Sequence, residues 1–66
     1  MSTAIGKNIH TLRKKQGLTQ EQLAELVNVS FQAVSKWENG NSVPDVSTLP
    51  VLANVLHCSI DSLLGY

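Results

Sequence analysis

Cysteine is scarce in this sequence, and its scarcity excludes two kinds of covalent or metal-based stabilisation. Cys58 is the one cysteine, so no disulfide can form within the chain, and no Cys/His cluster has the spacing of a metal site. No apolar run approaches the ~20 residues that a membrane-spanning helix needs. The N-terminus lacks the charged-then-apolar layout of a signal peptide. We therefore expect a cytoplasmic protein that holds no metal and has no place in a membrane.

The features of an enzyme are also missing. The sequence has no phosphate-cradling glycine loop, no activated nucleophile and no carboxylate pair with credible spacing, and His10 and His57 have no evident partners. His57 falls between two expected helices, at a point where positive φ is needed and histidine is tolerated, so its predicted role is structural. We expect neither catalytic activity nor a cofactor.

The net charge gives little support for a nucleic-acid partner. Five Lys and Arg residues balance five Asp and Glu residues, whereas attraction to phosphates is the main sequence-independent contribution to such binding. The cations are unevenly distributed, because all of them lie in the first 36 residues: Lys7, Arg13, Lys14, Lys15 and Lys36. One side of the protein can therefore be positively charged although the net charge of the chain is zero.

Helical periodicity accounts for most of the sequence, and no strand-like alternation is present. With 66 residues and 42% apolar content, the chain is expected to form one small domain over residues 1–66. Turn signals divide it into five short helices, which indicates an all-α fold. The expected helices span about residues 3–16, 19–28, 30–38, 46–56 and 59–65.

Capping residues mark three of the helix starts. Thr19 and Gln22 have the spacing of a capping box, and Ser30 and Ser59 stand at the starts of the third and fifth helices.

The start of the fourth helix is open to two interpretations because of Pro50. A cap at Asp45 places Pro50 in the fifth helical position, where it would lack a donor and crowd a carbonyl group. A cap at Ser47 places it in the first turn, where proline is tolerated. We favour a tight or 3₁₀-like opening near residues 46–48.

The second and third helices are joined by a very short link. Only Asn28 and Val29 precede Ser30, and so short a link forces two helices to cross steeply, as in a helix-turn-helix. Asn28 is predicted to adopt the left-handed conformation, which asparagine tolerates better than most residues.

The third helix has one apolar and one polar side at about 100° per residue. Ala33, Val34 and Trp37 are expected to face the core. Amide, hydroxyl and ammonium groups on the opposite side can bond to base edges in a major groove. A solvated face is the alternative, but an exposed aromatic residue at a helix start is unexpected without a partner. This outward side carries Phe31, Gln32, Ser35, Lys36 and Asn39, with Glu38 at its border.

The segments "GLTQEQLAELVNVSFQAVSKWENG" and "PDVSTLPVLANVLHCSIDSLLG" resemble the Cro and lambda-type repressor family, also called the Xre family. The resemblance covers residues 5–65, and the "WENG" ending is a fairly specific marker. It implies a compact five-helix, lambda-repressor-like fold with a recognition helix over about residues 30–38. Two departures are Asn28 in place of the usual glycine and Phe31 where many members are polar. The departure at Phe31 is expected to affect which DNA sequence the protein prefers, and not whether it binds DNA.

By this resemblance, the protein is a sequence-specific transcriptional regulator, expected to be a repressor, that binds double-stranded DNA. The expected base contacts are Phe31, Gln32, Ser35 and Lys36, and the expected phosphate contacts are Thr19, Gln20, Ser30 and Asn39. Arg13 and Glu38 lie at the borders of their apolar faces and are expected to form an ion pair between the first and third helices. The alternative function is a protein-interaction module or antitoxin-like adaptor with the same fold.

One helix-turn-helix reads only a few base pairs, so a homodimer on a two-fold-symmetric operator is expected. The candidate dimer contacts are Ile60, Leu63, Leu64 and Tyr66 of the fifth helix and the residues after it. The alternative is that these apolar groups complete the core. The family often uses this unit as the N-terminal part of longer regulators.

Overall fold

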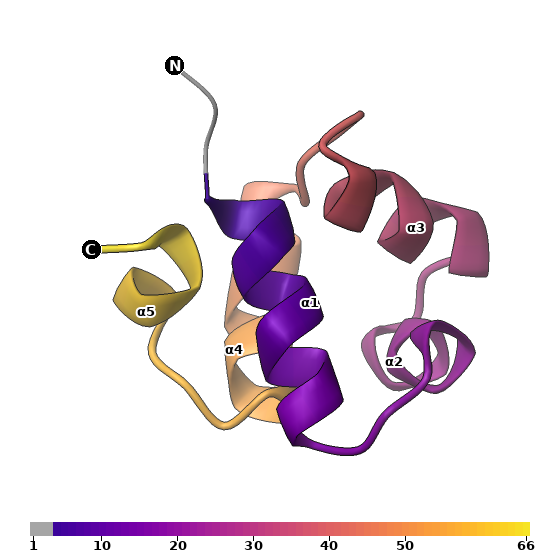
Figure 1. The fold of residues 1–66 in the computed structure, drawn as a ribbon, viewed down its shortest axis with the longest axis horizontal. Helices are drawn as coiled ribbons and strands as arrows, with labels where there is room; N and C mark the ends of the chain where they lie inside the picture. Colours follow the sequence, from indigo (N-terminus) through magenta and orange to yellow (C-terminus); the bar gives the residue numbers. More distant parts are fainter. Residues whose placement is uncertain (1–3) are drawn as a thin grey trace.

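Short helices with abrupt turns between them account for nearly all of the chain that the computed structural model describes, residues 4–66 (Figure 1). The predicted all-α fold of five short helices is confirmed, and the helix boundaries differ from the expected ones by one to three residues. The predicted start of the first helix near residue 3 lies outside the described residues. The elements are α1 (Ile5–Lys15), α2 (Gln20–Val27), α3 (Phe31–Asn39), the 3₁₀ helix η1 (Val46–Thr48), α4 (Leu49–Val55) and α5 (Ile60–Leu64).

The predicted caps determine where the helices begin. The Gln22 amide donates to the Thr19 hydroxyl oxygen at 3.0 Å, and the Thr19 amide donates to the Gln22 side-chain oxygen at 2.8 Å, which completes the capping box. Ser30 accepts from the third amide of α3, and Ser59 does the same in α5. Three of the five starts are thus set by local hydrogen bonds.

A left-handed residue makes the corner between α2 and α3. Asn28 has φ 60° and ψ 45°, and the amide of Val29 donates to the Ala24 carbonyl oxygen at 2.9 Å. This closes the end of α2, so α3 departs in a new direction. In Figure 1 α2 is seen nearly end-on, whereas α3 runs across the view. The predicted helix-turn-helix corner is confirmed.

The fourth helix opens as a 3₁₀ turn over Val46–Thr48, with Pro50 in the first turn of α4. This confirms the tight opening near residues 46–48. Neither Asp45 nor Ser47 provides a side-chain cap, because Asp45 precedes η1 without such a bond and Ser47 lies inside it. The backbone amide of Thr48 instead donates to the Asp45 carbonyl oxygen at 2.9 Å. The predicted positive φ of His57 is confirmed at 57°.

All five α-helices of the described residues 4–66 contribute to one core. Because α3 packs against both α1 and α2, its inner side chains are fixed while its outer side is left open. No helix within residues 4–66 is long and apolar enough to cross a membrane. The buried apolar residues of the core are Ile5, Ile9, Leu23, Ala24, Val27, Val34, Trp37, Leu52, Leu56 and Leu63.

Candidate nucleic-acid interface

The two sides of α3 differ in exposure as the helical periodicity predicts. Val34 and Trp37 are buried, with 0% and 5% of their surfaces exposed. On the outward side Gln32 and Lys36 are exposed, whereas Ser35 is half-buried. An amide and an ammonium group therefore project freely from α3, and the hydroxyl of Ser35 is more sheltered.

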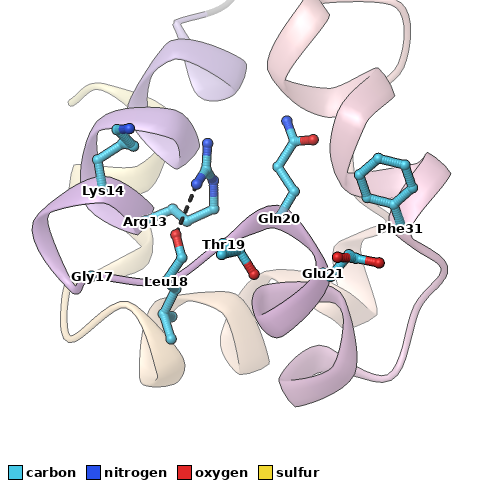
Figure 2. A pocket seen from close by; sticks show the side chains of 8 residues that line it. All are labelled: Arg13, Lys14, Gly17, Leu18, Thr19, Gln20, Glu21 and Phe31. Carbon is cyan, nitrogen blue, oxygen red and sulfur yellow. Dashed lines mark hydrogen bonds between the residues drawn. The ribbon is translucent and has the colours of Figure 1, made fainter.

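Phe31 is exposed over 44% of its surface at the start of α3 and borders a shallow groove of about 490 Å³. Figure 2 shows its ring beside the first turn of α2, where Gln20 and Glu21 lie. Thr19 and Lys14, whose side chain is a cation, also line this groove. Phe31 thus lies between the outward face of α3, which carries the predicted base contacts, and the start of α2, where the predicted phosphate contacts Thr19 and Gln20 lie.

The predicted phosphate contacts lie at helix ends. Thr19 and Ser30 cap α2 and α3, and both are exposed, as is Asn39 in the last turn of α3. The first amides of a helix point outward and carry its partial positive charge, which suits a phosphate group. Gln20 is half-buried, and its side-chain amide donates to Glu38 at 3.0 Å. This is the one hydrogen bond of the Gln20 side chain within residues 4–66, so its second N–H and its oxygen can bind another partner.

The predicted ion pair between Arg13 and Glu38 is present and largely buried. The Arg13 Nε donates to Glu38 Oε2 at 2.7 Å, and its Nη2 donates to Oε1 at 3.0 Å. A third bond runs from Nη1 to the carbonyl oxygen of Leu18 at 2.8 Å (Figure 2). Only 8% of the Arg13 side chain and 4% of the Glu38 side chain are exposed. This two-pronged contact holds α3 against α1.

Two more residues join this pair, and neither contact was foreseen. The expectation that His10 has no partner is wrong, because its Nδ1 lies 2.9 Å from Glu38 Oε1. Gln20, expected only as a phosphate contact, also binds the same oxygen. One signal was present in the sequence. His10 precedes Arg13 by one helical turn, so a partner of Arg13 also lies within reach of His10.

Burial and hydrogen bonding have opposite effects on the Glu38 carboxyl. Burial by itself raises the pKa, because it disfavours the charged form. Hydrogen bonds from Arg13, Gln20 and His10, together with the positive charge of Arg13, outweigh it and lower the pKa from 4.5 to about 2. Glu38 is therefore a carboxylate at neutral pH, although almost none of its side chain reaches water.

The four candidate dimer contacts do not form one exposed surface. Leu63 is 0% exposed and belongs to the core. Its prediction as a dimer contact is wrong, because its side chain packs entirely against other residues of this chain. Leu64 is half-buried and packs on the core. Ile60 and Tyr66 remain exposed, at 37% and 91%. The alternative that these groups complete the core therefore holds for Leu63 and in part for Leu64.

Known proteins share both the sequence pattern and the fold. The helix-turn-helix family HTH_3 matches residues 9–63. The chain is 41% identical over 61 residues to the HTH-type transcriptional activator BcrR of Enterococcus faecalis, covering 92% of this chain and 30% of that protein. It is 34% identical over 61 residues to the antitoxin PezA of Streptococcus pneumoniae, covering 92% of this chain and 39% of that protein.

A crystal structure of the c2 repressor of Salmonella phage P22 in complex with a synthetic operator has the same fold. The TM-score is 0.88 with 38% identity, and the match covers 92% of each chain. The chain thus spans well under half of the length of BcrR and of PezA. The family match, however, covers most of the chain. The chain therefore belongs to the helix-turn-helix family of Cro and lambda-type repressors.

Proposed function

We propose that the protein is a sequence-specific DNA-binding transcriptional regulator that acts as a repressor, with α3 in the major groove. The observation that carries the proposal is the exposed polar side of α3, which the buried Val34 and Trp37 hold outward. The c2 repressor of similar fold is seen with an operator, which supports the same use of this surface. Relatives such as BcrR and PezA come from bacteria, and on this likeness we place the protein in the cytoplasm, where bacterial DNA lies.

The exposed groups of α3 suit different base edges. The amide of Gln32 fits the donor and acceptor of adenine, and the ammonium of Lys36 fits the acceptors of guanine. Phe31 can cover a thymine methyl group, and Ser35 supplies a hydroxyl from a more sheltered position. Phosphates on either side are bound by the helix-end residues Thr19, Gln20, Ser30 and Asn39.

Two copies are needed for useful specificity. One recognition helix reads only a few base pairs, so paired half-sites about one turn of DNA apart require a dimer. Ile60 and Tyr66 are the exposed apolar residues near the C-terminal end, and Leu64 beside them is partly open. We place the dimer contact there, formed either in solution or on the operator.

Selection of bound oligonucleotides from a random duplex pool tests the proposal. A shared sequence with two-fold symmetry is expected, and binding weakens steeply with salt because counterions are released from the phosphates. Gln32→Ala and Lys36→Ala each reduce affinity for the selected duplex by about tenfold or more. Asn54→Ala, at an exposed position of α4, is the matched control and binds as the parent does. Failure to enrich any sequence contradicts the proposal.

The similarity to an antitoxin supports a second candidate, a protein-interaction module. Here Phe31 and the exposed part of α5 contact a protein partner. Salt then has little effect on binding, and Lys36→Ala leaves binding unchanged. These outcomes are the reverse of those expected for DNA.

A further inference from the structure

His10 lines a second open pocket, which shares Gln20 with the groove beside Phe31. The pocket has a volume of about 360 Å³ and is lined by Lys7, His10, Gln20, Glu38 and Asn39, which come from three helices. We propose that His10 is a further phosphate contact in its protonated form, so that DNA binding takes up a proton at this residue. The inference rests on the DNA binding proposed above and adds a regulation of it by pH.

The pocket brings together groups that suit a phosphate. Gln20 and Asn39, two of the expected phosphate contacts, share it with Lys7 and His10 of α1. The carboxylate in the pocket, Glu38, is only 4% exposed and is paired with Arg13. A phosphate at the mouth of the pocket therefore meets an ammonium, two amides and an imidazole, while the negative charge behind them is already balanced.

The hydrogen bond to Glu38 determines which nitrogen of His10 carries the proton. Glu38 is a carboxylate and can only accept, so the imidazole Nδ1, at 2.9 Å, must donate to it. Arg13 Nη2 lies 3.2 Å from the same nitrogen and has a second hydrogen beside the one it donates to Glu38. An Nδ1 that accepted this hydrogen would, however, point its lone pair at the Glu38 oxygen only 2.9 Å away, and two acceptors at that distance repel each other. In a neutral ring Nε2 is then left with a lone pair.

A lone pair at Nε2 repels a phosphate oxygen, since both are acceptors. When the ring gains a proton, both nitrogens donate, and His10 can bridge the Glu38 carboxylate and a phosphate at once. The side chain is 52% exposed, so Nε2 can reach a partner in solution. This bridge forms only when the His10 ring is charged, so uptake of a proton by His10 and binding of DNA are coupled.

Because of the charges around His10, a bound phosphate can change how readily the His10 ring takes up a proton. On its own helix the cations of Lys7 and Arg13 oppose a further positive charge, whereas Glu38 of α3 favours it. The residue that α2 contributes is the neutral Gln20, and Asp61 of α5 does not line the pocket. A phosphate bound beside Lys7 adds negative charge, so it shifts the balance toward the protonated ring.

The experiment compares the affinity for the selected operator duplex at about pH 6 and about pH 8, the range in which imidazole groups change charge. Ionic strength is held constant, and thermal unfolding at both pH values confirms that each variant is folded. Calorimetry in buffers with different ionisation enthalpies measures proton uptake directly. The parent is expected to bind about tenfold more tightly at the lower pH, as one charge-assisted hydrogen bond provides, with net uptake of protons.

The second histidine of the chain, His57, supplies the matched control, because the sequence has just two. His57→Asn retains a residue that tolerates positive φ and is expected to keep the full pH dependence and proton uptake. His10→Gln loses both, and His10→Lys binds at both pH values with the affinity that the parent reaches at the lower one.

The outcomes separate this inference from the proposed function. Failure of the parent to bind any duplex at either pH overturns the DNA-binding function itself. Tight binding that does not change with pH overturns the role of His10 alone. So does a pH dependence that His10→Gln retains, since the proton must then bind elsewhere.

Discussion

The backbone of Gly6 in α1 lies directly against the carbonyl group of Trp37 in α3. A Cβ at position 6 would overlap the Trp37 oxygen, so the two helices can approach this closely only because the residue has no side chain. The side chain of Trp37 is itself buried in the core. The same residue thus anchors α3 to the core by its side chain and to α1 by its backbone.

Gly6→Ala is therefore expected to destabilise the protein. In an exposed helix, glycine to alanine stabilises by about 1 kcal/mol, but a methyl group here forces α1 and α3 apart, which costs about 1–3 kcal/mol. Urea unfolding measures the change. Thr11→Ala, at an exposed position of the same helix, is the control and should shift stability by less than about 0.5 kcal/mol. A stabilised Gly6→Ala variant contradicts the close approach.

The buried pair of Arg13 and Glu38 is expected to show strong coupling. Removing either partner, as in Arg13→Leu or Glu38→Gln, leaves a buried polar group without its partner and costs about 3 kcal/mol. The double variant loses less than the sum of the two single variants, because neither charge is then stranded. A double-mutant cycle by urea unfolding tests this, and zero coupling energy removes the proposed role of the pair in fixing α3.

Acid is expected to weaken the fold through Glu38. The pKa of this group is about 2 in the folded protein against an ordinary 4.5, so the folded state binds fewer protons than the unfolded state between these values. The contribution is fully present above pH 4.5 and is lost as the pH falls toward 2, in total about 3 kcal/mol.

Unfolding by urea at a series of pH values between about 2 and about 6 measures this loss. Glu38→Gln should flatten that part of the profile, whereas Glu25→Gln, at an exposed position on α2, should leave its slope unchanged. An unaltered profile for Glu38→Gln would place the acid sensitivity in other carboxyl groups.

The corner between α2 and α3 could be predicted from the sequence because its determinants are local. Thr19, Asn28 and Ser30 act on amides or torsions within three residues of themselves, so their spacing is enough. The family resemblance extended this to the whole fold and to the Arg13–Glu38 pair. Periodicity also placed Val34 and Trp37 inside, because two helical faces of α3 differ clearly in polarity.

The contacts that were missed depend on how distant helices approach each other. His10 and Glu38 are 28 residues apart, and their contact follows from the distance between α1 and α3 that Gly6 permits. The error at Leu63 has another cause. α5 has only five residues, so its periodicity is too short to show which apolar side faces the core.

The remaining exposed apolar residues near the C-terminus are expected to hold two copies together on DNA. Ile60→Ser and Tyr66→Ser each remove apolar area from the surface, and Tyr66, at 91% exposed, contributes little to the packing of its own chain, whereas Ile60 is 37% exposed. Tyr66→Ser should leave unfolding nearly unchanged, Ile60→Ser should lower stability by about 1 kcal/mol, and both should reduce cooperative binding of a second copy to a palindromic duplex. Sedimentation of the complexes in an analytical ultracentrifuge reports how many copies are bound.

Leu26→Ser is the matched control, because this residue is 55% exposed on α2 and, in Figure 1, α2 lies on the opposite side of the molecule from α5. It should assemble on the duplex as the parent does. If the parent itself binds a palindromic site only as a monomer, no dimer contact exists at α5. If both serine variants still bind in pairs, the contact lies on another surface of the protein.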